Sequence, residues 1–258
     1  MIGAIDHIVI LVDDLAAAAA DYTALGFTVT PGGEHTGGAT HNALVVFADD
    51  AYLELIAFKR PAPEHHWYRH HALGEGLIDF ALLPTAIEAD LAAARERGLA
   101  IEGPVPGGRL RPDGQQVEWQ TGRAMTPDLP FLCGDVTARV LRVPDGAARA
   151  HANGVSGIAG LTVAVADLGA SVARYRALLG TAEREGAQPD LAERSAVFAL
   201  SDTAITLATP ADGGDTPLSA RLAARGEGPF ALALRGADQS TAFDLRLAHG
   251  ARMEIVGR

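Results

Sequence analysis

The chain contains one structural unit four times, and this repeat constrains its fold more than any other feature. The segment HIVILVDDLAAAAADYTALGFTV, which begins at His7, aligns without a gap with DFALLPTAIEADLAAARERGLAI, which begins at Asp79. Related segments begin at Gly160 and Ala231, so the four copies start 72, 81 and 71 residues apart. Self-similarity at a nearly fixed period indicates a fold assembled from copies of one supersecondary unit.

Each copy has the pattern β-α-β-β-β. An apolar strand is followed by an Ala-rich helix of about a dozen residues, whose apolar positions recur at helical spacing. A glycine closes the helix, as Gly26 and Gly98 do in the first two copies. In the first copy, the Gly-rich stretch PGGEHTGG is predicted to be a turn before the strands HNALVVF and AYLELIAF. The fourth copy reaches only β-α-β before Arg258.

These units predict an α+β fold in which copies pair into curved sheets, because a single βαβββ sheet leaves one face uncovered. We expect a first domain over residues 1–142, whose units at 3–58 and 76–135 enclose a cup. A linker is expected at 143–157, followed by a second region at 158–258 with one complete and one partial unit. A second copy of the chain could complete the partial unit, which predicts a homodimer.

The composition excludes several classes of partner. The formal net charge is −11, which disfavours nucleic acids and anionic membrane surfaces as partners. No apolar window is long enough to span a membrane, and the N-terminus lacks the basic region of a signal peptide. Cys133 is the only cysteine, so the chain cannot form an internal disulfide. We therefore expect a cytoplasmic protein, and the abundance of Ala and Gly suggests a bacterial one.

Three ionisable residues interrupt apolar strands in the first half: His7 in IDHIVIL, Glu54 in YLELIAF and Asp79 in GLIDFALL. His7 alternates with Ile5 and Val9 on one face of its strand. Burying such groups without partners is costly, and a divalent cation would satisfy an imidazole and carboxylates together. Structural alternatives stay open: His7 could bond to a neighbour, Glu54 could face solvent, and Asp79 could accept a bond from a buried hydroxyl group or cap a turn.

Other side chains are weaker candidates for the same cup. Residues that could line its pocket are His41, Asn42, Trp119, Phe131 and Cys133. Core packing is the alternative for the aromatic residues, and Cys133 could be a small buried hydrophobe. His66 and His70, in EHHWYRHHALGEG, would lie one helical turn apart and could form a lid that carries a ligand. They could equally belong to a solvent-exposed connection.

Tandem βαβββ units with a histidine in the first strand and a glutamate in the last resemble the vicinal-oxygen-chelate superfamily, most closely its glyoxalase-like branch. The stretches that carry the resemblance are IDHIVILVDDL, THNALVVFADDAYLELIAF, GEGLIDFALL, GGRLRPDG and LPFLCGD, between residues 3 and 135. The superfamily includes glyoxalase I, bleomycin-resistance proteins, extradiol dioxygenases and methylmalonyl-CoA epimerase. The resemblance implies one metal ion in the cup, held by the first and last strands of two paired units.

Carried onto this sequence, the resemblance implies His7 and Glu54 as metal ligands, with Asp79 at the position that matches His7 in the second unit. Glu54 and Asp79 would also be the catalytic carboxylates. The second unit departs from the pattern, because its last strand offers only Cys133 near the place of a fourth ligand. The third and fourth units carry no ligand residue at the matching positions. The second half is therefore expected to be a packing or dimerisation platform.

A site with one imidazole and one or two carboxylates suits Mn, Fe, Co, Ni, Zn or Mg. Such a cation can act as a Lewis acid on a substrate with two neighbouring oxygens, while a carboxylate moves a proton. The sequence thus predicts a metal-dependent lyase or isomerase that acts on a small molecule with vicinal oxygens. The alternatives are a metal-free small-molecule binding or resistance protein, and an interaction protein with a degenerate cup. Dioxygenase chemistry is disfavoured, because it requires two histidines and only one lies on a ligand strand.

Overall fold

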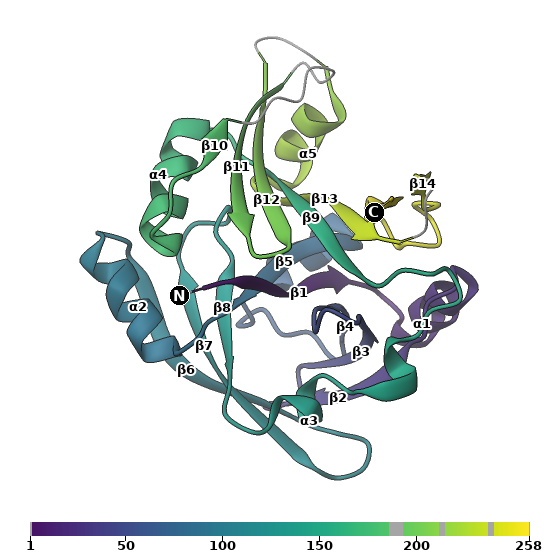
Figure 1. The fold of residues 1–258 in the computed structure, drawn as a ribbon. Coiled ribbons are helices and arrows are strands. Elements are labelled where there is room, and N and C mark those ends of the chain that lie inside the picture. Colours follow the sequence, from purple (N-terminus) through teal and green to yellow (C-terminus); the bar gives the residue numbers. More distant parts are fainter. Residues whose placement is uncertain (1, 186–192, 212–214, 237–239, 258) are drawn as a thin grey trace.

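The computed structural model describes residues 2–257 apart from 186–192, 212–214 and 237–239. Figure 1 shows two β-sheets: the first half of the chain closes into a barrel, and the second half forms an open sheet beside it. The predicted α+β fold, with curved sheets that enclose a cup, is confirmed. Among the described residues, no helix is long and apolar enough to cross a membrane.

The barrel consists of the first two βαβββ units, each with its elements in the predicted order. The first unit contains β1 (Ala4–Leu11), α1 (Leu15–Ala24), β2 (Thr30–His35), β3 (Thr40–Val46) and β4 (Tyr52–Phe58). The second contains β5 (Gly76–Leu83), α2 (Ile87–Glu96), β6 (Ile101–Leu110), β7 (Gln116–Ala124) and β8 (Phe131–Asp135), after a short 3-10 helix, η1 (Tyr68–Leu73). The strand order β1-β4-β3-β2-β6-β7-β8-β5 closes the barrel through the antiparallel pairs β1–β5 and β2–β6.

The Gly-rich stretch PGGEHTGG is not only a turn, because its first five residues belong to β2. A Cβ atom added at Gly32 would collide with the side chain of Asn42 in β3, and one at Gly33 would collide with the carbonyl oxygen of Leu110 in β6. Glycine is therefore required where β2 is pressed between its two neighbours. The prediction of a turn was wrong here because the glycines serve close strand packing.

The acidic pair that ends the first strand has a local role. Asp14 is the N-cap of α1, and its carboxylate accepts hydrogen bonds from the backbone N–H groups of Ala16 and Ala17. Asp167 holds the same position before α4 (Leu168–Leu179) in the third unit. An N-cap carboxylate satisfies N–H groups that have no partner within the helix. The repeated strand ending is thus a helix start signal.

The second half forms a seven-stranded sheet in the order β10-β11-β12-β9-β13-β15-β14. Its strands are β9 (Gly157–Ala164), β10 (Arg184–Glu185), β11 (Glu193–Leu200), β12 (Thr203–Pro210), β13 (Gly228–Arg235), β14 (Thr241–Ala242) and β15 (Met253–Val256). Besides α4, the helices after the barrel in the described residues are α3 (Arg139–Arg142), η2 (Gly146–Arg149) and α5 (Pro217–Arg225). A capping box between Thr216 and Ser219 starts α5, which the repeat did not predict.

Among its described residues, the fourth unit lacks the predicted helix. β14 occupies the place where that helix would begin, and residues 245–250 form a turn that leads to β15. Ala248 N–H donates to the carbonyl of Asp244, which gives one helical turn. His249 and Gly250 then adopt positive φ angles of 51° and 74°, which end it. The prediction of β-α-β was wrong for this unit because the segment left after β14 is too short for a helix.

The tripeptide Gly-Glu-Gly before β5 and before β13 has the same function in both halves. Glu75 accepts a hydrogen bond of 2.8 Å from the backbone N–H of Asp13, just after β1. Glu227 accepts one of 2.8 Å from the backbone N–H of Ala166, just after β9. Each glutamate therefore links the start of its own unit, by a hydrogen bond, to the end of the first strand in the paired unit. This shared contact explains why the tripeptide recurs.

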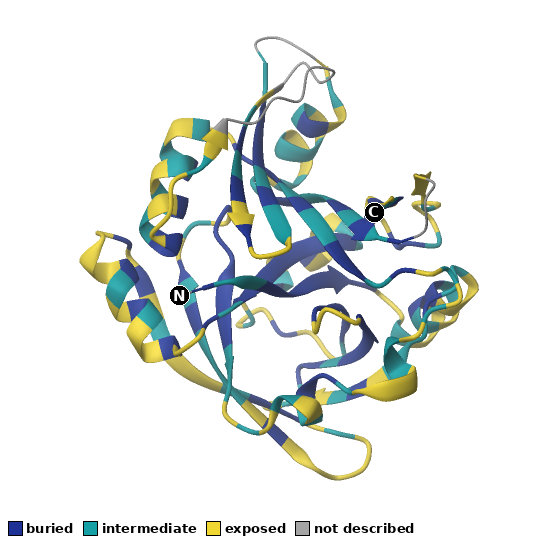
Figure 2. Ribbon diagram, viewed as in Figure 1, coloured by how far each residue is buried: buried dark blue, intermediate teal, exposed yellow. Residues whose placement is uncertain are grey.

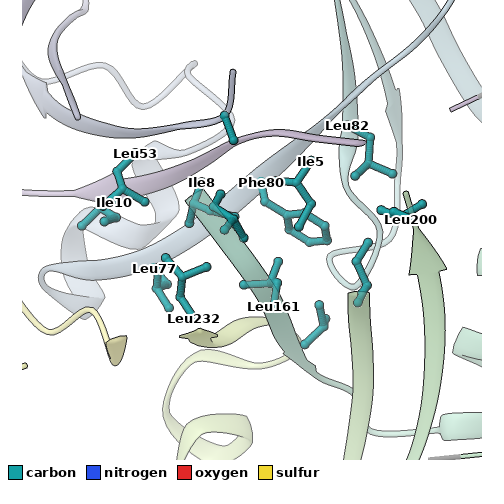
Figure 3. Close-up of a cluster of buried hydrophobic side chains, with 14 of the residues drawn as sticks. Ile5, Ile8, Ile10, Leu53, Leu77, Phe80, Leu82, Leu161, Leu200 and Leu232 are labelled. Atoms are coloured by element: carbon teal, nitrogen blue, oxygen red, sulfur yellow. The ribbon is translucent and has the colours of Figure 1, made fainter. Parts of the chain in front are cut away.

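One hydrophobic core joins the barrel to the open sheet. Ile8 of β1 and Phe80 of β5 point outward from the barrel and pack toward Leu161 of β9 and Leu232 of β13, as Figure 3 shows. Figure 2 shows that the strands between the two layers are buried, whereas the outer face of α2 is exposed. The second half therefore covers the outer face of the barrel wall that carries His7.

The segment predicted as a linker, 143–157, packs against the barrel. The side chain of His151 bonds to the backbone N–H of Thr28, and the Asn153 amide donates to the carbonyl of Leu25. Val143 is fully buried against β3 and β4. This segment is consequently part of the barrel surface.

Candidate functional site

The barrel encloses a cavity of about 460 Å³. Its lining includes His7, His35, Thr40, Tyr52, Glu54, His65, His66, Trp67, Glu102, Gly107, Arg109, Trp119, Arg123, Phe131, Cys133 and Arg142. A concave apolar site with a few convergent polar groups is the usual form of a small-molecule site.

Alternation along β1 determines which side chains face the cavity. His7 lines it, and Val9 and Leu11 lie in the cluster inside the barrel, whereas Ile8 and Ile10 face the shared core. Ile5 also lies in the shared core, so the predicted alignment of Ile5 with His7 was wrong. The pairing between β1 and β5 shifts register between Ile5 and His7, and such an irregularity changes which face a side chain occupies.

His7 is held by a buried carboxylate and an aromatic ring. Its Nδ1 lies 2.6 Å from Oδ2 of Asp6, and its ring stacks on that of Tyr52 with centroids 4.6 Å apart. Burial raises the pKa of Asp6, but Arg142 and His7 outweigh burial and hold that pKa well below its usual value. Asp6 is therefore ionised and accepts from His7 Nδ1–H, which leaves His7 Nε2 on the side of Glu54, 3.5 Å from its Oε2.

Asp6 is itself fixed by two arginines from the segment after β8. Arg142 is 1% exposed and its Nη1 lies 2.6 Å from Oδ2 of Asp6, while Nη1 of Arg139 lies 2.8 Å from Oδ1. Arg142 also donates to Asp135 and to the hydroxyl of Tyr52. The orientation of the His7 ring thus depends on a buried network that sequence patterns did not reveal.

Glu54 lies between two imidazoles. Asn42 donates to its Oε1 at 2.6 Å, and Nε2 of His35 lies 3.3 Å from the same oxygen. Burial raises the pKa of Glu54, but His35, His7 and Asn42 stabilise the carboxylate and bring its pKa down to about 2. Glu54 is therefore a buried, permanently ionised group at neutral pH.

His35 was missed in the sequence because it follows the glycines that indicated a turn. Its Nδ1 bonds to the hydroxyl of Thr40, and its Cα lies opposite that of Arg109 across the β2–β6 junction. The sequence disfavoured dioxygenase chemistry because only one histidine lies on a ligand strand. This reason does not hold in the structure, because His35 is a second histidine next to Glu54. A signal was present: His35 belongs to the same alternating set as Gly33 once the stretch is taken as a strand.

The structure does not bring Asp79 to His7 and Glu54. Its Oδ2 accepts from Trp67 Nε1 at 2.7 Å and from Arg123 Nη1 at 2.6 Å. It lies opposite Val9 in the β1–β5 pair, and it does not line the cavity. The prediction of Asp79 as a third ligand was wrong because an arginine and an indole already satisfy its carboxylate.

The weaker pocket predictions divide in two. Trp119, Phe131 and Cys133 line the cavity, and burial raises the pKa of the Cys133 thiol to about 12, so the thiol stays protonated. Asn42 acts through Glu54, as described above. His41 does not line the cavity, and burial lowers its pKa.

The two histidines predicted to form a lid also differ. His66 lines the cavity beside His65, and the two rings stack with centroids 4.6 Å apart. Burial and the neighbouring Arg123 lower the pKa of His66 to about 3, so this imidazole is neutral at neutral pH. His70 is a buried residue of η1 itself; its Nε2 accepts from Arg69 Nε, and it does not line the cavity.

The donor set agrees with part of the metal site that the resemblance implies. A histidine whose Nδ1–H is bound by a carboxylate is oriented as metal-ligating histidines are. Adjacent ligands of one cation lie about 3.0–3.4 Å apart, close to the separations of Glu54 from His7 (3.5 Å) and His35 (3.3 Å). Within the described parts of the chain, however, no three His, Cys, Asp or Glu side chains are arranged to hold a metal ion. The residues therefore fit a cation held by two protein ligands with open positions.

Comparison with known families agrees with this architecture. The model of a family described as a glyoxalase-like domain matches residues 5–179. The chain belongs to the glyoxalase-like family. The resemblance predicted from the repeated units is thus confirmed, within the vicinal-oxygen-chelate superfamily. A search of curated proteins finds no match to this glyoxalase-like protein.

Solved structures share the fold of the glyoxalase-like protein at low identity. A hypothetical protein from Staphylococcus aureus has a TM-score of 0.74 and 15% identity, over 98% of this chain and 99% of that one. A mutant of 4-hydroxymandelate synthase from Streptomyces coelicolor has a TM-score of 0.66 and 17% identity, over 92% and 72%. A fusion of a xylose isomerase-like TIM barrel with 4-hydroxyphenylpyruvate dioxygenase has 0.57 and 18%, over 92% and 37%. These similarities establish the fold alone.

Proposed function

We propose that this glyoxalase-like protein is a divalent-metal-dependent lyase or isomerase that acts on a small molecule with vicinal oxygens inside the barrel. The observation that supports this most directly is the arrangement of Asp6, His7 and Glu54. A carboxylate orients the imidazole, and the free Nε2 faces an ionised carboxylate in a cavity of about 460 Å³. A divalent cation bound by both groups would further compensate the burial of the ionised carboxylate.

His7 and Glu54 would hold the cation, which would be Zn, Mn, Fe, Co, Ni or Mg. When bound, it would supply Lewis-acid stabilisation of negative charge on a substrate oxygen. Asp6 keeps His7 Nε2 available, because it binds the proton on Nδ1. Asn42 donates to Oε1 of Glu54, whereas His7 lies nearest to Oε2, so Asn42 helps to fix the carboxylate.

The proton-transfer role predicted for Glu54 passes to His35 in this proposal. A carboxylate with a pKa of about 2 is a weak base at neutral pH, so Glu54 is better suited to hold charge. The His35 imidazole lines the same cavity, and its Nε2 lies 3.3 Å from Glu54. The hydroxyl of Thr40 bonds to the other ring nitrogen, which keeps Nε2 on the side of Glu54.

Carbon-bound hydrogen exchange tests this function without knowledge of the product. We expect the metal-loaded protein to exchange hydrogen for deuterium next to the carbonyl of 2-hydroxyketones or 2-oxo compounds in D2O, because charge on the oxygen acidifies that C–H bond. Proton NMR measures the exchange. His7→Ala and Glu54→Gln should lower the rate by at least about a hundredfold. Glu102→Gln is the control, because Glu102 lies in an exposed part of the cavity rim.

A second candidate function is metal-free binding of a small molecule. It is favoured by the finding that no three potential ligand residues in the described structure are arranged around one point. In that case His35 and His7 would serve as charge partners of Glu54. This second function would be supported if hydrogen exchange stayed at the rate of buffer alone with every cation, while small molecules still bound to the protein in the presence of a chelator. Oxygen consumption in the Fe(II)-loaded protein would instead indicate the oxygenase chemistry that His35 makes available.

A further inference from the structure

Arg109 is a buried arginine that faces the cavity. It lies on β6, opposite His35 of β2, and it lines the cavity together with Gly107 and Val105 on the same face of the strand. Only 2% of its surface is exposed. Its guanidinium group is therefore available to a molecule in the cavity and shielded from bulk water.

Arg109 has no carboxylate partner among the described residues. Its Nη2 donates to the backbone carbonyl of Arg142 at 2.7 Å, and its Nε has no hydrogen-bond partner in the part of the chain that the structure describes. The two other arginines of the lining are already paired: Arg123 with Asp79, and Arg142 with Asp6 and Asp135. A guanidinium group carries five N–H donors and stays charged, and a buried charge without a counter-ion is costly.

Glu54, a carboxylate that lines the cavity, does not fill this role. Asn42 and the imidazoles of His35 and His7 lie next to the two carboxylate oxygens of Glu54. Neither of these oxygens lies within 4.0 Å of an Arg109 nitrogen. Burial lowers the pKa of Arg109 more than Tyr52 and Glu54 raise it, which is the signature of incomplete compensation. The cavity thus contains the fixed positive charge of Arg109, and no residue that the structure describes supplies its counter-ion.

We propose that Arg109 binds the carboxylate of an organic acid whose apolar body packs against Trp67, Trp119 and Phe131. The inference rests on the proposed function, because it names the substrate class for the same cavity. A planar guanidinium group matches a carboxylate and can donate to both of its oxygens. The aromatic walls then select acids with a flat apolar group, and the oxygens next to the carboxylate are directed toward His7 and Glu54.

The chain carries its own reporter for this binding. It has two tryptophans, and both line the cavity. Tryptophan fluorescence, excited where the ligands do not absorb, is measured during titration with benzoate and with its neutral isostere benzamide. EDTA is present throughout, so the measurement needs neither metal nor turnover. We expect benzoate to bind about tenfold more tightly than benzamide, since only the carboxylate pairs with the guanidinium group.

Two substitutions and one matched control assign the preference to Arg109. Arg109→Met should remove the preference for benzoate, and Arg109→Lys should retain the charge but weaken benzoate binding, because an ammonium group lacks the planar fork. If the methionine variant does not fold, the lysine variant decides. Arg111→Met is the control, because Arg111 lies two residues further along the chain, pairs with Asp113 and does not line the cavity.

Three results would overturn the proposal: no benzoate binding, equal affinity of the wild type for benzoate and benzamide, or an unchanged preference in both Arg109 variants. Failure of the proposed function has a different signature. A protein that binds no metal and exchanges no hydrogen, but keeps the Arg109-dependent preference for benzoate, would be a metal-free binder of organic acids.

Discussion

Replacing Arg142 by methionine is expected to lower the free energy of unfolding by about 3 kcal/mol. Arg142 is 1% exposed and pairs with Asp6, which is fully buried, and with Asp135. Methionine fills a similar volume, so the main loss is the counter-ion of a carboxylate that cannot reach water. The expected cost lies at the low end of the range for broken buried pairs, because Arg139 still contacts Asp6. Urea unfolding at neutral pH measures it.

A surface ion pair provides the matched control. Arg149 pairs with Asp50 and Asp145, whose side chains are 56% and 66% exposed. Arg149→Met should therefore cost less than about 1 kcal/mol. Adding Asp6→Asn to Arg142→Met should restore part of the stability, because the unpaired charge is removed. Equal costs for Arg142→Met and Arg149→Met would show that the buried network does not support the barrel.

The acid sensitivity of the protein is expected to depend on Glu54. Its pKa falls from 4.5 in the unfolded chain to about 2 in the fold, so its contribution to stability is complete above about pH 4.5 and is lost as the pH falls toward 2. Between about pH 6 and about pH 3 the loss is roughly 1.5 pKa units, or about 2 kcal/mol. Glu54→Gln should lack this part of the pH dependence, whatever its stability at neutral pH.

Unfolding free energies at the two pH values, measured with a denaturant, provide the test. Glu102→Gln is the control, because Glu102 is an exposed glutamate of the same cavity and should leave the pH dependence as it is in the wild type. If Glu54→Gln and the wild type lose the same free energy on acidification, Glu54 is not held as a buried carboxylate. The electrostatic basis of the proposed site would then be wrong.

The sequence predicted the barrel and two of its central side chains because both leave local signals. Repeated strands with alternating faces specify the curved sheets, and a polar residue in an apolar strand stands out, as His7 and Glu54 do. Asp79 has the same local signal, but its partner Arg123 lies 44 residues away, and nothing in the spacing shows that the two meet. Polar partners across a barrel depend on register, which the sequence pattern left open.

The remaining site residues could not be predicted for the same reason, because their roles depend on contacts between distant strands and segments. His35 lies among glycines that serve close strand packing, Arg142 lies in a segment next to the predicted linker, and Arg109 occurs in GGRLRPDG, which has the composition of a turn. Turn-like composition arises wherever the backbone must approach a neighbour closely, so glycine alone does not separate a turn from a crowded strand. Asp6 was adjacent to His7, yet its role depends on arginines more than 130 residues away.

The most direct test of the metal-dependent site is the metal content of tag-free protein purified without a chelator, measured by inductively coupled plasma mass spectrometry. We expect about one equivalent of a divalent metal in the wild type and in Glu102→Gln, and a loss of it in both His7→Ala and Glu54→Ala. No metal in the wild type, even after reloading with each candidate cation, would contradict the account. Full retention in both variants would contradict it equally, because the cation would then be held elsewhere.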